Sequence, residues 1–245
     1  MLSKNSKYLG SEPLGGDERG FTLIEIVAAL VITVGLVLAV YKSYELFIKI
    51  AACSDLKVTA QQDARAAIEM ISSDLKLIGY GIPEKDPDTR EVIPAVVKAT
   101  PGELTVRFKD PDGGSAMGAD HLLVTYKVGG APHYPLIKSV CQASDHNDSG
   151  SSCVEDGFIG NLDPAADGGG LYFTYYNVEG EEIMPWLLVS PDDIRDALFS
   201  IIEIEVKLGV RSEKECIKLD GTTGYASLVL ETRSLLRNRN PMKIR

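Results

Sequence analysis

The chain has 245 residues, 44% of them hydrophobic and 24% charged, a composition that excludes a wholly disordered protein. The formal net charge of -10 disfavours broad binding to nucleic acid, which requires a surplus of lysine and arginine. Residues 1–20 are neutral overall, so the remainder carries all of this charge. Basic side chains near the C-terminus are interpreted as a solvated tail: Arg233, Arg237, Arg239, Lys243 and Arg245.

The first predicted element is an apolar helix over residues 21–41, where Glu25 is the only charged side chain. Twenty helical residues span about 30 Å, the thickness of a bilayer's hydrocarbon core. A cleaved secretory signal would end in small residues, whereas residues 41–44 are bulky and charged. The segment therefore predicts a transmembrane helix.

Glu25 raises a physical question, because a carboxylate at the centre of such a helix costs roughly 2.5–3.5 kcal/mol. The nearest cation within the helix is Lys42, about 25 Å away along the axis. A free α-amino group would serve if the chain were cut just before Phe21, and the amine of one copy would then meet the carboxylate of another. The alternative is an interfacial acid that reaches toward the headgroups.

The stretch GFTLIE, residues 20–25, followed by an apolar run, resembles the N-terminal motif of type IV pilins and of the pseudopilins of type II secretion. The resemblance implies that residues 1–20 are a leader and that prepilin peptidase cuts between Gly20 and Phe21. It also implies N-methylation of Phe21, and pairing of Glu25 with the new N-terminus of a neighbouring subunit.

Residues 61–83, QQDARAAIEMISSDLKLIGYGIP, resemble the stretch after the anchor in PilW-like minor pilins and in the related J-type minor pseudopilin. The near-terminal LETRSLLRNRNP also resembles the end of that family. The resemblance implies a structural, non-enzymatic subunit that helps to initiate or cap a type IV pilus. Two alternatives remain open: a minor pseudopilin of a type II secretion system, and a tip adhesin or other binding module.

The resemblance also implies a location and partners. The uncut chain would be a single-pass inner-membrane protein with its head in the periplasm, and the mature chain would join the filament, at its tip. Its partners would be other major and minor pilins through their anchor helices, prepilin peptidase and the inner-membrane assembly platform, with no cofactor. No proline lies between Phe21 and Ile82, so the kinked or melted anchor of some filaments is in doubt.

Residues 42–80 predict an amphipathic continuation of the helix, because apolar side chains recur there at steps of four and three. This stripe comprises Ala64, Ile68, Ile71, Leu75 and Ile78. The helix should stop at Gly79. A single helix from Thr22 to Ile78 would be about 85 Å long. Arg65 and Asp74 either hold the docked head or lie on a solvated face.

Residues 81–245 predict a β-rich head. Strands are expected at 92–99, 103–110, 121–129, 171–178, 183–190, 200–210 and 225–236, with loops at 110–120, 141–153 and 163–170. Residues 190–200 suggest one helical turn, with Ser190 as N-cap and Pro191 at the first position. The predicted fold is α+β: a long N-terminal helix, transmembrane in its first half, packed on an antiparallel sheet.

Four cysteines allow three pairings. An exported head would meet an oxidising compartment, and Cys141 and Cys153 flank a polar loop, so a bridge between them is the favoured pairing. The pairing of Cys53 with Cys216 stays open. No Cys-x-x-Cys motif occurs, which argues against a zinc or redox site.

Other candidate chemistry is weak. The three histidines, His121, His133 and His146, stand apart, and the chain has no nucleophile–base motif. We therefore expect no catalytic site and no metal site. Carboxylates in acidic turns offer oxygen ligands of the kind that calcium takes, although they match no EF-hand loop and also suit plain turns: Asp110, Asp112, Asp163 and Asp167. Trp186 is expected in the core.

Overall fold

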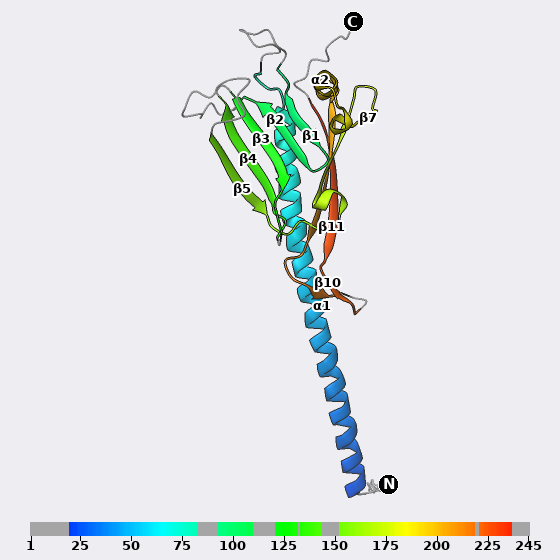
Figure 1. Ribbon diagram of the computed structural model, residues 1–245. Helices are drawn as coiled ribbons and strands as arrows, with labels where there is room; N and C mark the ends of the chain where they lie inside the picture. Colours follow the sequence, from blue (N-terminus) through cyan, green and yellow to red (C-terminus); the bar gives the residue numbers. More distant parts are fainter. Residues whose placement is uncertain are drawn as a thin grey trace, which may run out of the picture. The chain divides into compact units, whose positions relative to one another are not determined.

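The structure is a computed structural model of the whole chain (Figure 1), and it describes residues 20–82, 93–109, 121–131, 133–143, 152–218 and 221–236. The chain divides into two compact units, residues 1–48 and 49–245. Helix α1, Leu23–Leu77, contributes to both. The predicted leader, residues 1–20, lies outside the described residues except for Gly20, as does the C-terminal tail beyond residue 236.

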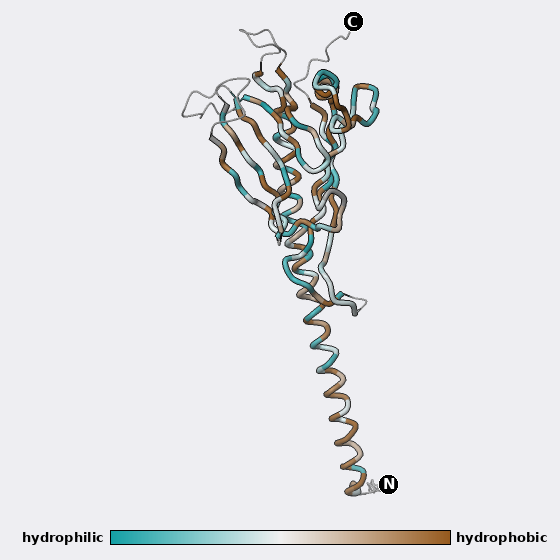
Figure 2. The backbone as a smooth tube through the Cα atoms, in the orientation of Figure 1, coloured by the Kyte–Doolittle hydropathy of each residue, from teal (hydrophilic) through white to brown (hydrophobic). Residues whose placement is uncertain are grey.

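In the first unit, α1 is an unbroken helix without a proline. Its apolar side chains are exposed all around the axis. Figure 2 shows the hydrophobic residues of this stretch in brown. The helix is long and apolar enough to cross a membrane, and none of the most apolar window is buried. This agrees with the predicted anchor, because a helix that is apolar on all sides needs lipid or other helices around it.

In the second unit, two antiparallel sheets and a short ribbon lie against the rest of α1. The five-stranded sheet has the order β1-β2-β3-β4-β5, and the four-stranded sheet has the order β11-β8-β6-β7. The first sheet comprises β1 (Val96–Thr100), β2 (Glu103–Phe108), β3 (His121–Val128), β4 (Leu136–Ala143) and β5 (Ser152–Ile159). The second comprises β6 (Leu171–Tyr176), β7 (Glu182–Ile183), β8 (Glu203–Arg211) and β11 (Ser227–Leu235). The ribbon pairs β9 (Cys216–Ile217) with β10 (Thr223–Gly224).

One apolar core joins α1 to both sheets. The stripe predicted on the helix is buried at Ala64, Ile71, Leu75 and Ile78, whereas Ile68 is only half-buried and Ala67 takes the inner position. Strand β8 alternates as expected, with its even-numbered residues from Ile204 to Val210 facing the core. The fold is therefore α+β, with a long N-terminal helix packed on antiparallel sheet.

The helix ends where the glycines predict. Gly79 adopts a left-handed conformation with φ of 76°, which terminates α1 two residues after Leu77. The Gly79 N–H then donates to the Arg107 carbonyl oxygen at 3.0 Å, and the Lys109 N–H donates to the Tyr80 carbonyl oxygen at 2.8 Å. These two bonds continue the ladder of β2, so they fix the end of the helix against the sheet.

Three predictions for the head are wrong in detail. The segment 141–153 is not one loop, because Cys141 lies in β4 and Cys153 lies in β5. Residues 183–190 form no long strand: a 3-10 turn, η2 (Pro185–Leu187), follows the two-residue β7. The segment expected to make one helical turn is the ten-residue helix α2 (Pro191–Ser200). A second 3-10 turn, η1 (Asp167–Gly170), precedes β6.

Candidate functional site

The start of α1 is built around Thr22, which acts as the N-cap. Its side-chain oxygen accepts a hydrogen bond from the Glu25 N–H at 3.3 Å, and its carbonyl oxygen accepts from the same N–H at 3.0 Å. Thr22 and Glu25 thus occupy the first and fourth positions of a Thr-x-x-Glu capping box. The cap uses only residues after Phe21, so removal of residues 1–20 would leave it intact.

Gly20 and Phe21 precede the helix and are exposed. The Phe21 side chain is 79% exposed, and a Cβ added at Gly20 would meet no atom within 4 Å. The bond between these residues therefore lies in non-helical, accessible chain, the form in which a protease can bind a substrate. Glu25 belongs to the first turn of α1, where the positive end of the helix dipole favours a carboxylate.

The head holds its part of α1 through a buried polar network as well as through apolar packing. The Tyr126 hydroxyl on β3 donates to Asp74, and the Lys138 Nζ on β4 lies 2.6 Å from the same Asp74 oxygen. Tyr126 is fully buried, and burial first, then the Asp74 charge, raise the pKa of its hydroxyl well above the ordinary value. Of the predicted pair, Arg65 is exposed, and only Asp74 contacts the sheet.

Two disulfides tie the head together. Cys141 and Cys153 lie directly opposite each other in the β4–β5 ladder and are bridged, which is the pairing that the sequence favours. Cys53 on α1 is bridged to Cys216 on β9, so the β9–β10 ribbon is fastened to the helix across a sequence separation of 163 residues. A bridge over so long a loop strongly restricts the unfolded chain.

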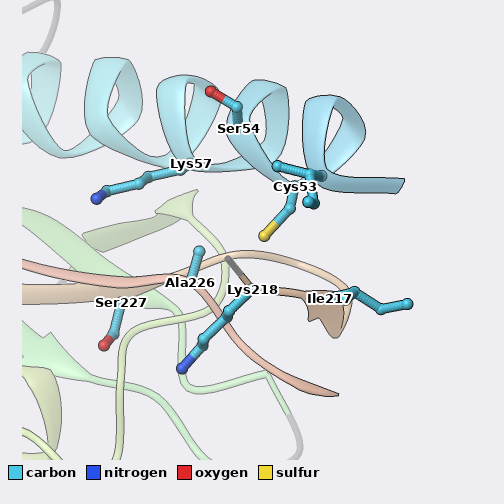
Figure 3. Close-up of a pocket in the computed structure, with 8 residues that line it drawn as sticks. Cys53, Ser54, Lys57, Ile217, Lys218, Ala226 and Ser227 are labelled. Atoms are coloured by element: carbon cyan, nitrogen blue, oxygen red, sulfur yellow. The ribbon is translucent and has the colours of Figure 1, made fainter. Parts of the chain in front are cut away.

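A pocket of about 530 Å³ lies beside the Cys53–Cys216 bridge (Figure 3). Apolar groups from α1 and the ribbon line it, with Lys57 and Lys218 as its charged side chains. Figure 3 shows Lys57 coming from the helix and Lys218 from the chain directly after β9. Neither a carboxylate nor a histidine is among the described lining residues, so the pocket suits an anionic or apolar group.

The metal candidates do not converge in the part of the chain that the structure describes, where no three His, Cys, Asp or Glu residues are placed to hold an ion. His121 is buried on β3, whereas His133 is exposed. The Asp163 side chain accepts from the Ala165 N–H at 3.1 Å, which is an ordinary turn contact. His146, Asp110 and Asp112 lie outside the described residues, as does the Asp167 side chain.

One polar cluster was not predicted from the sequence. On the outer face of the four-stranded sheet, the Tyr176 hydroxyl donates to Glu205 at 2.7 Å, and Arg233 Nη2 donates to the same carboxylate at 3.0 Å. The Arg233 guanidinium also lies 4.5 Å from the centre of the Tyr176 ring. The three side chains come from three different strands, and the register between these strands brings them together. The sequence predicts only that Glu205 lies on the outer face, through the alternation of β8.

This cluster predicts a dependence of stability on pH. The hydrogen bond from Tyr176, and then Arg233, lower the pKa of Glu205 below its ordinary value of 4.5. The pKa of Glu205 is lower in the folded chain than in the unfolded chain. The ionised carboxylate therefore stabilises the fold fully at pH values above the unfolded-state pKa, and this stabilisation is lost as the pH falls through the folded-state pKa.

The urea concentration at the unfolding midpoint should fall between about pH 5 and pH 3 in the parent. We expect this fall to be smaller in Glu205→Gln. Urea unfolding of the full chain in detergent measures it. Glu231→Gln is the matched control, because Glu231 lies on the neighbouring strand β11 with 57% of its side chain exposed. An equal flattening in both variants would contradict the role given to Glu205.

Comparison with known proteins gives no identity for the chain, since no family model matches it and no curated protein matches it.

Proposed function

We propose that this chain is a structural, non-enzymatic subunit of a type IV pilus, a PilW-like minor pilin that is cut before Phe21 and helps to initiate or cap the filament. The observation that carries the proposal is the capped start of α1: an accessible Gly20–Phe21 bond, then Glu25 in the first turn of a helix that is apolar on every side. The α+β head packed on the second half of the same helix supports it.

The mechanism is assembly. Cleavage creates a Phe21 amine, methylated once, at the positive end of the helix dipole, where a cation is unfavourable without a partner. The Glu25 carboxylate of a neighbouring subunit supplies that partner, and each charge relieves the cost of the other in lipid. Anchor helices then pack on one another and remove their exposed apolar side chains from lipid, while the heads stay outside the membrane.

A substitution at Gly20 tests the processing step. In cells that make prepilin peptidase, we expect the parent chain to begin at Phe21 with one added methyl group. Gly20→Leu should instead remain as the uncut precursor, starting at Met1. A Cβ added at Gly20 meets no atom within 4 Å and the residue is exposed, so a defect reports recognition by the peptidase rather than misfolding. Mass spectrometry of the N-terminal peptide gives the answer.

Gly35→Leu is the matched control. A Cβ at Gly35 also meets nothing within 4 Å, but Gly35 lies inside the anchor and away from the cleaved bond. This control should be processed normally. Normal-length mature protein from Gly20→Leu would remove the processing step from the proposal.

The same observations support a minor pseudopilin of a type II secretion system, since both kinds of subunit use this anchor. Deletion of the gene separates the two. Loss of surface pili, with export intact, is expected for the pilus subunit. Loss of exported proteins, with pili intact, would instead assign the chain to secretion.

A further inference from the structure

Five apolar side chains project into solvent from one short segment of the head, residues 178–189. Their exposed fractions are 70% for Val178, 42% for Met184, 65% for Leu187, 38% for Leu188 and 93% for Val189. Single exposed apolar side chains are normal on a soluble surface, but a cluster of them marks contact with another molecule. We call these five side chains the apolar patch.

The apolar patch sits on a rigid frame. Pro185 is buried, and the Trp186 ring packs edge-on against Tyr175, with the ring centres 6.0 Å apart. The Leu187 N–H donates to the Met184 carbonyl oxygen at 3.0 Å, which closes the turn. The exposed side chains are therefore held on a fixed backbone, and a preformed surface loses little freedom when a partner binds.

Exposed carboxylates flank the patch in the sequence on both sides. Residues 178–196 contain six acids and one base, Arg195, for a net charge of -5, which is half of the -10 of the whole chain. The acids are Glu179, Glu181, Glu182, Asp192, Asp193 and Asp196, all exposed. We call them the acidic rim. Figure 2 shows the hydrophilic turn before β7 followed directly by hydrophobic chain. An apolar centre inside a charged rim is the usual build of a protein interface.

We propose that the apolar patch and its acidic rim dock the head of a different filament subunit, one that presents an apolar surface bordered by lysine or arginine. A second copy of this chain fits poorly, because pairing the patch with itself would set one acidic rim against another. An anionic membrane surface is disfavoured for the same reason. The inference rests on the proposed function, since it takes the partner from the same filament.

The first experiment identifies the occupant. A photo-crosslinking amino acid replaces Val189 in the full-length chain, in membranes of cells that make the other subunits. Val154 on β5, 61% exposed, is the matched control position. We expect a crosslink from position 189 to a different protein that carries its own N-terminal anchor with an acid near its start, and none from position 154. Mass spectrometry of the joined peptides should place the contact on a basic, apolar face of that partner.

The second experiment measures the contact with that partner, both proteins being full-length and in detergent. Leu187→Asp with Val189→Asp should weaken association by about tenfold or more, because these are two of the most exposed side chains of the patch. Val154→Asp should leave it unchanged. Asp193→Lys with Asp196→Lys should slow association and reduce its dependence on salt. Thermal unfolding of each variant checks that the head is intact.

Four results would overturn the docking proposal: a crosslink from position 189 to a second copy, to residues 237–245 of the same chain, or to lipid, or no crosslink at all. Two measurements on the same cells keep this separate from the proposed function, namely the N-terminal residue of the chain and its presence in sheared filaments. If both are normal while the crosslink fails, only the docking surface is lost. If both are abnormal, the pilin assignment itself fails.

Discussion

Glu25→Gln should remove the chain from filaments while leaving its processing normal. The substitution keeps the size and shape of the side chain but deletes the charge that we propose pairs with the Phe21 amine of a neighbour. Breaking a charge pair that is shielded from water costs about 3–5 kcal/mol, which corresponds to a drop of roughly a hundredfold or more in incorporation. The measurement is the amount of this chain in sheared filaments relative to the amount in membranes.

The structure indicates that Glu25→Gln should change the charge of this side chain and leave the fold unchanged. The cap on α1 uses the backbone N–H of residue 25, which a glutamine retains, so the start of the helix should be unchanged. The N-terminal peptide of the variant should still begin at Phe21. Glu45→Gln is the matched control: Glu45 is an acid of the same unit that pairs with Lys42 at 3.1 Å and has no assigned role in assembly. Equal incorporation of both variants and the parent would refute the pairing of Glu25.

The anchor and the helical part of the head could be predicted because their signals are local. A run that is apolar apart from Glu25 and Thr33 predicts the first half of α1, and apolar residues at steps of four and three predict the second half. Gly79 predicts the stop, since glycine adopts the left-handed backbone found at that point without strain. In the same way, the strict alternation of β8 predicts which of its side chains face the core.

The errors lie where tertiary contacts override local preference. The end of β4 and the start of β5 are rich in polar residues, which favours a loop. They are held as strands because β4 pairs with β3, β5 pairs with β4, and the Cys141–Cys153 bridge joins the two. Residues 183–190 are apolar and read as strand. Pro185 has no N–H to donate to a ladder, and Trp186 turns inward onto Tyr175, so the chain forms η2 instead.

The candidate site also has a part that the sequence predicts and a part that it does not. The roles proposed for Gly20, Phe21 and Glu25 follow from a motif of adjacent residues, so the sequence by itself is enough to predict them. The Tyr176–Glu205–Arg233 cluster and the apolar patch could not be predicted, because each depends on strand register or on which apolar side chains the core leaves outside.

For Asp74 the sequence predicts two possible roles. Its place on the helix is compatible both with anchoring the head and with a solvated face, and the sequence alone does not choose between them. The choice depends on Tyr126 and Lys138, which lie on strands far away in the sequence. A polar contact of this kind becomes visible only when the sheet is placed against the helix.

Asp74→Ala should destabilise the head by about 3–5 kcal/mol, the largest effect on folding that we expect of a single substitution. The change would leave the Tyr126 hydroxyl buried without an acceptor and the Lys138 ammonium, 21% exposed, without its counter-ion. Asp63→Ala, at an exposed position on the same helix, should cost far less. Urea unfolding of the full chain in detergent measures both.

A double-mutant cycle tests whether the network acts as a unit. Lys138→Met alone removes the counter-ion of Asp74, so it should also destabilise. Asp74→Leu with Lys138→Met replaces the pair by apolar groups of similar size, so no unpaired charge is left, although the Tyr126 hydroxyl still loses its acceptor. We therefore expect the double variant to lose less stability than the sum of the losses in Asp74→Leu and Lys138→Met. Losses that simply add would mean that the two charges act independently, and that apolar packing, rather than this network, holds α1 in the head.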